Sequence, residues 1–428
     1  EFPTSVEITF NESIEAGKQY EITISDVADC SGNLIEEITF SFGLGRSPVF
    51  NELIITEIMF DPDPQLELPN REFIEVYNAT EDIISIEGVE LTDASSTVDL
   101  PPMMIGPGMY YVLTSTSAAS EFGGNVIGVP SFPSLNNSGE QLILSQNEGL
   151  IFSVNYDPEW HDEDKSEGGV TLEMKDVSNP CKEEDSWGSS DDPDGGTPGR
   201  ANSITESFPD NFSPEIIRVL ALAGDSVRID FNEKLTPSNQ IGVDVQLSPS
   251  VTVEEIIFNF LYPQALFIKL SSQLTENVPY TLTISDVSDC SGNTSDDLSA
   301  VFALPVQAVE EEIKLSEVLF NPRPNGVDFV EVYNVSEKYI NFKFWFTSND
   351  PLNEELVPLS VTDNILPPND IAVFTVLPDV LRNQYPQGDH SRVFLAPLPT
   401  MPNEEGRIAF ISADLEVIDA FDYNEDLH

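Results

Sequence analysis

The chain has few basic residues and few histidines. Lys and Arg number 18 in 428 residues, against 75 Asp and Glu, which gives a formal net charge of -57. Such a charge repels phosphate backbones and anionic lipid surfaces, so we expect no nucleic-acid partner. The three histidines are His161, His390 and His428, and none belongs to a conspicuous cluster. A structural or surface role is expected for His161 and His428.

Motifs of enzyme and cofactor sites are also missing. The sequence has no His-x-x-x-His or Cys-x-x-Cys pair, no Walker loop and no dinucleotide-binding fingerprint. Its carboxylates are too numerous for any two to be chosen as a general acid and base. We therefore predict no catalytic residues, no cofactor-binding residues and a protein that is not an enzyme.

Long apolar runs are absent. No stretch of 18 apolar residues occurs, and Glu1–Thr4 lack the features of a signal peptide, so we expect no membrane insertion in this segment. The remaining composition is that of a folded protein, because 40% of the residues are hydrophobic and 9% are aromatic. A chain of 428 residues exceeds one hydrophobic core, so roughly three or four domains are expected.

An internal repeat organises the chain. Tyr20–Asn33, which contains Asp-Cys-Ser-Gly-Asn, recurs as Tyr280–Asn293, at an offset of 280 − 20 = 260 residues. At the same offset Leu53–Phe60 matches Ile313–Phe320, so two adjacent modules repeat in a fixed order. The first module opens in mid-domain, and the last one stops at His428 without its final third. The chain therefore looks like a window from something longer.

Strand patterns dominate both modules. Runs such as Ser226–Asn232, Tyr280–Ile284 and Phe73–Tyr77 alternate apolar and polar residues, as half-buried strands do. Helical periodicity is nearly absent, and 32 Pro and 24 Gly supply turns between the runs. These patterns predict an all-β fold of sandwiches or closed barrels.

The motif Asp289–Asn293 is expected to turn the last hairpin of the first module type. Gly292 and Asn293 suit the left-handed backbone that such a turn needs. The alternative is a ligand site made by Asp286 and Asp289.

The second module type resembles a lamin-tail domain, and the first resembles the Ig-like domains of bacterial S-layer-type proteins. The lamin-tail motifs are Ile55-Thr-Glu-Ile58, Phe73-Ile-Glu-Val-Tyr-Asn78, Ile86-Glu-Gly-Val-Glu-Leu-Thr-Asp93, Ile105-Gly-Pro-Gly-Met-Tyr-Tyr-Val-Leu113 and the tail Trp187–Gly199. The Ig-like motifs are Ser213–Ile216, Val227–Glu233 and the Asp-Cys-Ser-Gly-Asn turn. The second lamin-tail copy departs from the pattern at Phe344-Trp345-Phe346 and at Pro368-Asn369.

This resemblance implies the architecture: an all-β chain of tandem Ig-like β-sandwich modules in an elongated array. The expected domains are residues 1–45, the C-terminal part of an Ig-like domain; 51–204, a lamin-tail domain; 207–306, an Ig-like domain; and 311–428, a C-terminally incomplete lamin-tail domain.

The resemblance also implies a setting. Alternating modules of these kinds look like large secreted or cell-surface proteins of Bacteroidetes-type bacteria, often exported by type IX secretion. We interpret the chain as a non-catalytic extracellular scaffold, adhesin or filament segment whose partners are other protein modules or cell-surface components. The alternative is a set of accessory binding modules of a secreted hydrolase or nuclease whose catalytic domain lies outside this chain.

The three cysteines follow the modules. Cys30 and Cys290 lie in the two copies of the Ig-like turn, and Cys181 lies in the lamin-tail tail. In an Ig-like sandwich the last hairpin turn lies at the pole of the N-terminus, so Cys290 should face the preceding module. We predict a Cys181–Cys290 disulfide and a partner for Cys30 upstream of residue 1. Buried reduced cysteines are the alternative.

Two acidic loops are candidates for calcium, the one cofactor that the sequence suggests. Asp61, Asp63 and Glu67 gather carboxylates of the kind that hard cations bind. The second copy has Asn321, Arg323 and Asn325 there, so a solvated loop is the competing interpretation. The acidic run 183–194 is either a charged linker edge or a second calcium site.

Aromatic residues offer a candidate glycan site. Phe344, Trp345 and Phe346 are consecutive rings of the kind that bind carbohydrate when exposed. Alternation along Asn341–Phe346 buries at least one face, so core or interdomain packing is the alternative.

Overall fold

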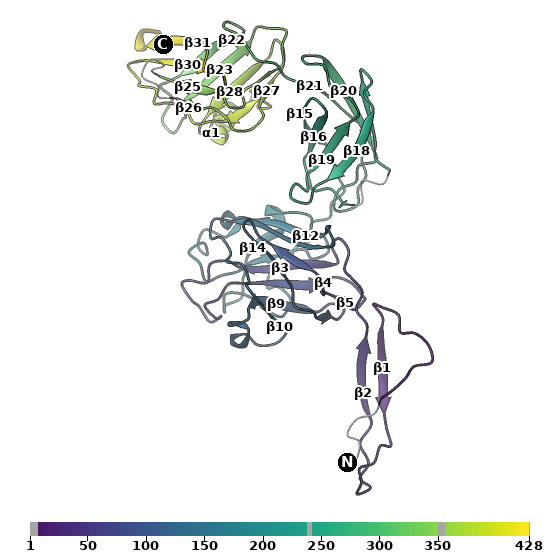
Figure 1. Ribbon diagram of the computed structural model, residues 1–428. Helices are drawn as coiled ribbons and strands as arrows, with labels where there is room; N and C mark the ends of the chain where they lie inside the picture. Colours follow the sequence, from purple (N-terminus) through teal and green to yellow (C-terminus); the bar gives the residue numbers. More distant parts are fainter. Residues whose placement is uncertain (1–6, 238–241, 350–355, 428) are drawn as a thin grey trace. The chain divides into compact units, whose positions relative to one another are not determined.

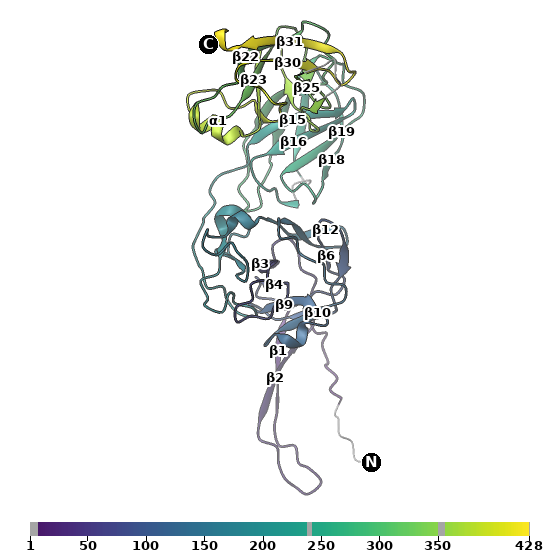
Figure 2. The same ribbon diagram turned by 90° about the vertical axis from the view of Figure 1, so that its left-hand side faces the viewer.

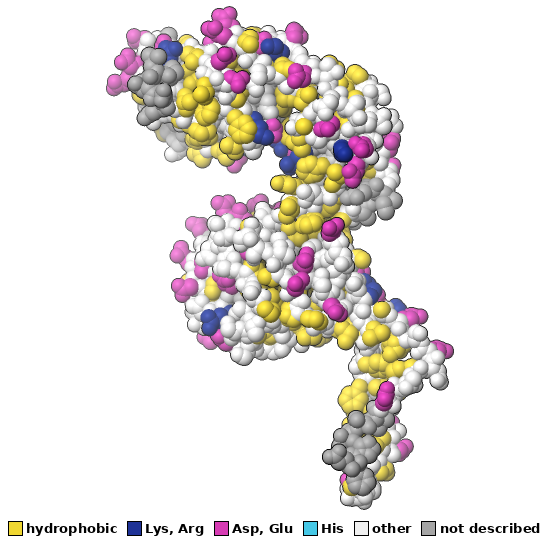
Figure 3. Space-filling model, viewed as in Figure 1, with side chains coloured by type: hydrophobic (Ala, Val, Ile, Leu, Met, Phe, Trp, Pro, Cys, Tyr) yellow, Lys and Arg dark blue, Asp and Glu magenta, His cyan; other side chains and the backbone are white. Residues whose placement is uncertain are grey.

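The computed structural model describes residues 7–237, 242–349 and 356–427, and their regular structure is almost entirely β (Figure 1). Contacts divide the chain into two compact units. The first unit comprises residues 1–213, 234–238 and 288–293, and the second comprises residues 214–233, 239–287 and 294–428. Asp and Glu side chains dot the face seen in Figure 3, where Lys and Arg are few, in keeping with the net charge of -57.

The first unit contains a hairpin and a β-sandwich. Strands β1 (Gln19–Ile24) and β2 (Ile38–Gly43) pair antiparallel and are seen as a long hairpin in Figure 2. One sandwich sheet has the order β10 (Val126–Val129), β9 (Tyr110–Ser115), β4 (Phe73–Asn78), β3 (Leu53–Met59), β13 (Leu172–Met174), β14 (Trp187–Ser189). The other sheet has the order β12 (Gly149–Tyr156), β11 (Glu140–Gln146), β6 (Glu90–Thr92), β7 (Thr97–Asp99). Two short strands, β5 (Ile84–Ser85) and β8 (Met104–Ile105), pair with each other.

The two sheets of this sandwich share one hydrophobic core. Its members come from both sheets and include Ile55, Val76, Leu142, Phe152 and Trp187, all at most 2% exposed. Strand β3 is buried along its whole length, because the core covers one face and a later segment of the chain covers the other. Each such aliphatic or aromatic side chain contributes about 1.5–3 kcal/mol by leaving water.

The second unit begins with an Ig-like sandwich. One sheet has the order β15 (Ile216–Ala223), β16 (Ser226–Phe231), β19 (Ala265–Leu270), β18 (Val253–Phe258), and the other β17 (Asp244–Ser248), β20 (Pro279–Ser285), β21 (Leu298–Ala303). Alternate residues of the middle strands, such as Ile229, Ile268 and Leu282, are fully buried, as the period-2 pattern requires.

A third sandwich completes the second unit. Its sheets have the orders β22 (Ile313–Leu319), β23 (Phe329–Asn334), β28 (Ile371–Thr375), β29 (Val393–Leu395) and β26 (Val357–Pro358), β25 (Phe346–Ser348), β30 (Glu405–Ile411), β31 (Val417–Asn424). Strands β24 (Ile340–Asn341) and β27 (Ile365–Leu366) form a short pair. The two larger sheets share a core that contains Val332, Phe342, Trp345 and Phe410, none of them exposed.

The all-β class and the tandem Ig-like sandwiches predicted from the sequence are confirmed. The three alternating runs singled out there lie in β16, β20 and β4. One α-helix, α1 (Pro378–Gln384), departs from the expectation of almost no helix. It has Pro in its first turn and a single buried residue, Leu381, which packs with Phe329 and Val393, so its short apolar stripe left no periodic signal.

The first and third sandwiches, which contain the two copies of the repeat, have different residues at two left-handed backbone positions. Gly88 and Phe344 are each the third residue of a four-residue turn. The turns are closed by Val89 N to Ile86 O and by Trp345 N to Phe342 O, each 3.1 Å, and the φ angles of Gly88 and Phe344 are +75° and +63°. Gly108 and Asn369 have φ of +65° and +57°, and the N–H of each donates to the carbonyl of the asparagine that ends β4 or β23. Asn tolerates this left-handed conformation, whereas in Phe the Cβ atom lies too close to the following carbonyl oxygen, which destabilises the backbone there.

Replacing Phe344 by glycine is therefore expected to stabilise the third sandwich by about 0.5–1 kcal/mol. The ring is 57% exposed, so little packing is lost. Urea unfolding followed by the fluorescence of the adjacent, buried Trp345 measures the change. Phe344→Ala removes the ring but keeps Cβ and should bring no gain; equal effects of the two variants would show that the ring matters and the backbone does not.

Candidate functional site

The structure joins Cys181 to Cys290 by a disulfide. The two Sγ atoms are 2.07 Å apart, the Cα atoms 5.6 Å, and the residues are separated by 109 positions. Cys181 lies between β13 and β14, and Cys290 lies in the Asp289–Asn293 turn. The Asn51 side-chain amide lies against both sulfur atoms, at 3.5 and 3.3 Å. The structure thus brings together the two cysteines that were paired from the sequence.

The turn that carries Cys290 is built around Asp289, which is fully buried. Its carboxylate accepts hydrogen bonds from the backbone N–H and the side-chain amide of Asn293, at 2.7 and 2.9 Å. Gly292 has φ of +93°, as predicted, but Asn293 is not left-handed, so that part of the prediction is wrong. Asn293 serves the turn through its side chain, the left-handed residue of the turn is Gly292, and Asp286, just before the turn, is also left-handed with φ of +60°.

The turn around Cys30 repeats this construction. Asp29 accepts from the backbone N–H and the side-chain amide of Asn33, at 2.9 and 2.8 Å, and Gly32 has φ of +84°. Cys30 itself is exposed and has no disulfide partner among the described residues. The same five-residue sequence thus gives the same local structure with and without the disulfide.

Polar contacts surround the Cys181–Cys290 bond within the first unit. Ser291 Oγ donates to Asn179 Oδ1 or Asp210 Oδ2, at 3.1 and 3.2 Å. Lys234, only 7% exposed, donates to the backbone carbonyl of Ser153 at 2.9 Å and pairs with Glu183 at 2.8 Å. A buried ammonium group must be paired in this way to offset its lost hydration. The cystine therefore sits in a closed, hydrogen-bonded setting and not on a loose loop.

A row of three buried carboxyl groups crosses the six-stranded sheet of the first unit. Glu173, Glu57 and Glu75 lie on the adjacent strands β13, β3 and β4, and the register places Glu173 opposite Glu57 and Glu57 opposite Glu75. All three are 0% exposed. The sequence does not reveal this row. Alternation along each strand places the three glutamates on the polar face of the sheet, where exposure to solvent is the usual expectation.

Residues 197–204, which begin in the Gly-Gly-Thr-Pro-Gly end of the tail, cover the row and supply hydrogen-bond donors to it. Backbone N–H groups of Thr197 and Gly199 donate to Glu57 and Glu75, at 2.6 and 2.7 Å. The carboxylate of Glu173 accepts from the backbone N–H groups of Ser203 and Ile204 and from the hydroxyls of Ser203 and Thr197, at 2.7–3.2 Å. The hydroxyls of Thr171 and Thr56 donate to Glu57 and Glu75. The carboxyl row thus fastens the tail to the sheet.

Burial changes the protonation of this row. Removal from water, reinforced by the neighbouring Glu75, raises the pKa of Glu57 well above its ordinary value. Burial likewise raises the pKa of Glu75 to about 8, against the hydrogen bonds from Thr56 and Gly199, which lower it. Glu57 Oε2 has no hydrogen-bond partner in the part of the chain that the structure describes. Burial therefore favours the neutral forms of Glu57 and Glu75, and because solvent does not reach the row, its role is structural.

A buried asparagine ends strand β4 of the first sandwich and strand β23 of the third. Asn78 and Asn334 are both 0% exposed. The side-chain amide of Asn78 donates to three backbone carbonyls, those of Asp82, Ile105 and Gly106, and its oxygen accepts from the N–H and hydroxyl of Thr80. Asn334 makes the matching set with Lys338, Leu366, Pro367 and Ser336. Asn78 belongs to a motif visible in the sequence, but its hydrogen bonds to distant backbone carbonyls are visible only in the structure.

The residues proposed for calcium do not come together. Asp61, Asp63 and Glu67 are not among the described acidic groups whose oxygens lie within 4.8 Å of one another. The Asp61 carbonyl instead accepts from Gly169 N at 2.7 Å. In the run 183–194, several carboxylates already have cationic partners: Glu183 pairs with Lys234, Asp191 with Lys165, and Asp192 with Arg200, all at 2.7–2.8 Å. Neither loop forms a preassembled cation site.

The three aromatic residues proposed for glycan binding do not share a surface. Trp345 is 0% exposed and packs edge-on against Phe342, with ring centroids 4.9 Å apart. Phe344 is exposed and Phe346 is half-buried. Core packing, the alternative drawn from the sequence, is what the structure shows for Trp345.

His161 has a structural position. Its Nδ1 lies 2.8 Å from Ser189 Oγ, and its ring contacts Phe60 at a centroid distance of 5.6 Å. Burial lowers the pKa of His161 to about 4, so the ring is neutral at pH 7. His390 Nε2 lies 2.8 Å from the Tyr385 carbonyl. His428 lies outside the described residues.

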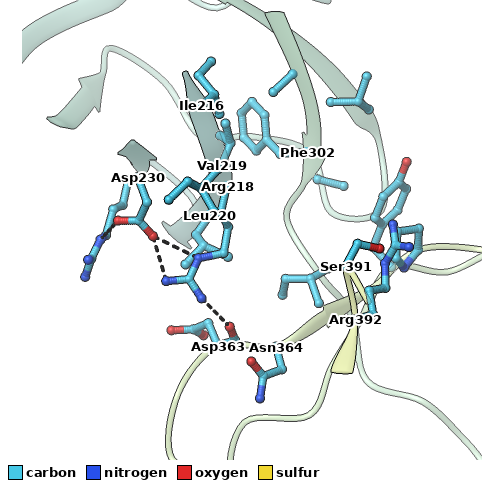
Figure 4. Close-up of a pocket in the computed structure, with 18 of the residues that line it drawn as sticks. Ile216, Arg218, Val219, Leu220, Asp230, Phe302, Asp363, Asn364, Ser391 and Arg392 are labelled. Atoms are coloured by element: carbon cyan, nitrogen blue, oxygen red, sulfur yellow. Dashed lines mark hydrogen bonds and ion pairs between the residues drawn. The ribbon is translucent and has the colours of Figure 1, made fainter. Parts of the chain in front are cut away.

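A hollow of about 630 Å³ in the second unit is drawn in Figure 4. Arg218 donates twice to Asp230 from Nε and Nη2, at 2.9 and 2.7 Å, and reaches the Asp363 carbonyl at 3.5 Å. Arg392 pairs with Asp370 at 2.8 Å. These arginines are neutralised by carboxylates, and no His or Cys lines the hollow.

Comparison with known proteins identifies one part of the chain. Residues 46–158 match the Lamin Tail Domain family, which covers most of the first sandwich. No match is found among curated proteins. Among solved structures, the N-terminal part of the bacterial S-layer protein SbsC is similar at 10% identity and a TM-score of 0.23, over 50% of this chain and 44% of that one. A likeness of this size does not establish a shared fold. No helix among the described residues is long and apolar enough to cross a membrane.

Proposed function

We propose that this chain is a segment of a non-catalytic extracellular scaffold, an adhesin or filament component, in which disulfides brace successive β-sandwich modules. The observation that carries the proposal is the Cys181–Cys290 bond, which ties the lamin-tail tail to the Asp289–Asn293 turn. Disulfides persist in oxidising compartments, which supports a secreted or cell-surface location. Export by the type IX route from a Bacteroidetes-type cell, with other modules or surface components as partners, is part of the same proposal.

The polar clusters of the described structure support a structural role. The carboxyl row of Glu57, Glu75 and Glu173 is sealed from solvent, and its hydrogen bonds hold the tail. At the hollow of Figure 4, Arg218 and Arg392 form ion pairs with Asp230 and Asp370. Converging, solvent-accessible groups of unlike pKa, which catalytic sites use, do not occur at either place.

The exposed Cys30 extends the proposal. Because its turn reproduces the hydrogen bonds of the turn around Cys290, we expect Cys30 to bond a tail cysteine like Cys181 on a neighbouring module. One cystine per module boundary would then run along the assembled protein.

Pulling the chain by its ends is expected to show the bond directly. A cystine that spans 109 positions withholds about 380 Å of extended backbone, at 3.3–3.6 Å per residue. Under oxidising conditions the total extension in force spectroscopy should be shorter by that length, and dithiothreitol or Cys181→Ser should restore it.

The variant Cys30→Ser is the matched control and should leave the extension unchanged. Thiol counting gives an independent check: the native chain should react with one equivalent of a thiol reagent, and the reduced, unfolded chain with three. An oxidised chain that extends fully and reacts at all three cysteines would overturn the proposal.

A further inference from the structure

The two ends of the connection between β20 and β21 enclose a hollow of about 500 Å³ in the second unit. Its lining consists only of oxygen-bearing residues, Ser285, Asp286, Ser295, Asp296 and Asp297. No Lys or Arg lines it, unlike the acidic run 183–194, in which Glu183, Asp191 and Asp192 have cationic partners. The charge gathered there is uncompensated by the residues of the hollow itself.

A second observation concerns Ser295. Its side chain is 5% exposed, and its Oγ has no hydrogen-bond partner in the described parts of the chain. Leaving a buried hydroxyl unsatisfied costs about 1–3 kcal/mol, so native structures seldom retain one without a reason. A cation bound by the Ser295 oxygen would give this hydroxyl a partner.

The repeat preserves the acidic positions. The counterparts of Asp286, Asp296 and Asp297 are Asp26, Glu36 and Glu37, and Asp26 has φ of +59° where Asp286 has +60°. The backbone also matches, since Ile35 N donates to Val27 O at 2.8 Å and Ser295 N donates to Val287 O at 2.7 Å. The first copy thus keeps the carboxylates but has Ile35 in place of the buried hydroxyl.

We propose that this hollow binds a calcium ion, with carboxylate oxygens of Asp286, Asp296 and Asp297 and the hydroxyls of Ser285 and Ser295 as ligands. Calcium takes 6–8 oxygen ligands in a flexible geometry, and water would complete the set. The three carboxylates do not converge within 4.8 Å as they stand, so their exposed side chains rotate inward on binding. An open site of this kind has the affinity of extracellular modules, with a Kd of about 10⁻⁴–10⁻³ M.

The test is equilibrium dialysis of the full chain with calcium in 0.15 M NaCl. The double variant Asp296→Asn/Asp297→Asn should bind one ion fewer per chain than the unaltered protein. The control, Glu255→Gln/Asp414→Asn, removes the same charge from exposed positions outside the hollow and should bind as many ions as the unaltered chain. Ser295→Ala should raise the Kd of that ion several-fold.

Calcium bound only as a diffuse counterion to a chain of charge -57 would respond equally to both double variants, and that result would overturn the proposal. Melting curves recorded without calcium verify folding, because the exposed aspartates contribute little to stability in the metal-free state. A double variant that melts like the unaltered chain and still binds the same number of ions contradicts the site outright.

Discussion

Replacing Asn78 by alanine is expected to lower the free energy of unfolding of the first sandwich by about 3–5 kcal/mol. The side chain is fully buried and makes five hydrogen bonds, three as a donor to backbone carbonyls and two as an acceptor from Thr80. Alanine would leave those buried carbonyls without donors, which costs the desolvation of each group and not merely the net value of a bond. No other residue of similar volume has both a forked donor and an acceptor.

Hydrogen exchange read by mass spectrometry localises the effect. Protection of β3 and β4 should fall in Asn78→Ala, while protection of β22 and β23 stays unchanged, and Asn334→Ala should give the mirror result. Asn70→Ala, at an exposed position in the same sandwich, serves as control and should shift stability by no more than about 0.5 kcal/mol. Uniform loss of protection across both units would mean that the asparagines act on the whole chain and not on their own modules.

The second large effect is expected from Glu57→Gln. Glutamine copies the protonated carboxyl group: its oxygen can accept from Thr171 and Thr197 as Glu57 Oε1 does, and it carries no charge. At pH 8 this variant should be more stable than the unaltered chain, because the folded sandwich no longer buries a glutamate that is ionised in the unfolded chain. At pH 5 the two proteins should be nearly equal.

The raised pKa values determine whether the free energy of unfolding rises or falls with pH. In the unfolded chain a glutamate titrates near 4.5, whereas in the folded sandwich burial raises the pKa of Glu75 to about 8 and that of Glu57 well above 4.5. Between these values the folded state binds more protons than the unfolded state, so the free energy of unfolding falls as pH rises from about 4.5 to about 8. Chemical unfolding monitored through Trp187, at pH 5 to 9, follows this decline.

Glu57→Gln should flatten the decline, and the exposed Glu81→Gln should not. If the glutamine variant proves less stable than the unaltered protein at pH 8, with the same slope, the row must be ionised and balanced by some other means.

Most of the fold could be predicted because alternation carries it. Strands β4, β16 and β20 are half-polar sequences whose apolar residues face a core, and their period of two is visible without any tertiary information. The helix α1 could not be found in this way, because one buried leucine in seven residues sets no period. Phe344 also looked like a buried or ligand-binding ring, since nothing local shows that it takes the backbone of a glycine.

The sites were harder, because their partners are distant in sequence. Cys181 and Cys290 could be paired because each belongs to a recurring module whose ends were expected to meet. Alternation places Glu57 and Glu75 on the polar face of their strands. They are buried only because residues 197–204, more than a hundred positions away, cover that face. The calcium site at Asp61, Asp63 and Glu67 stays a prediction: the three residues are close along a proline-containing loop, but their carboxylates do not converge in the structure.

The turn around Cys30 has all its hydrogen bonds while its sulfur is still a thiol. The turn can therefore fold before its cysteine is oxidised. Disulfide formation then becomes a separate, later step, which takes place when two folded modules come into contact. Under the function proposed above, a mild reductant would open the disulfides and leave these hydrogen-bonded turns in place.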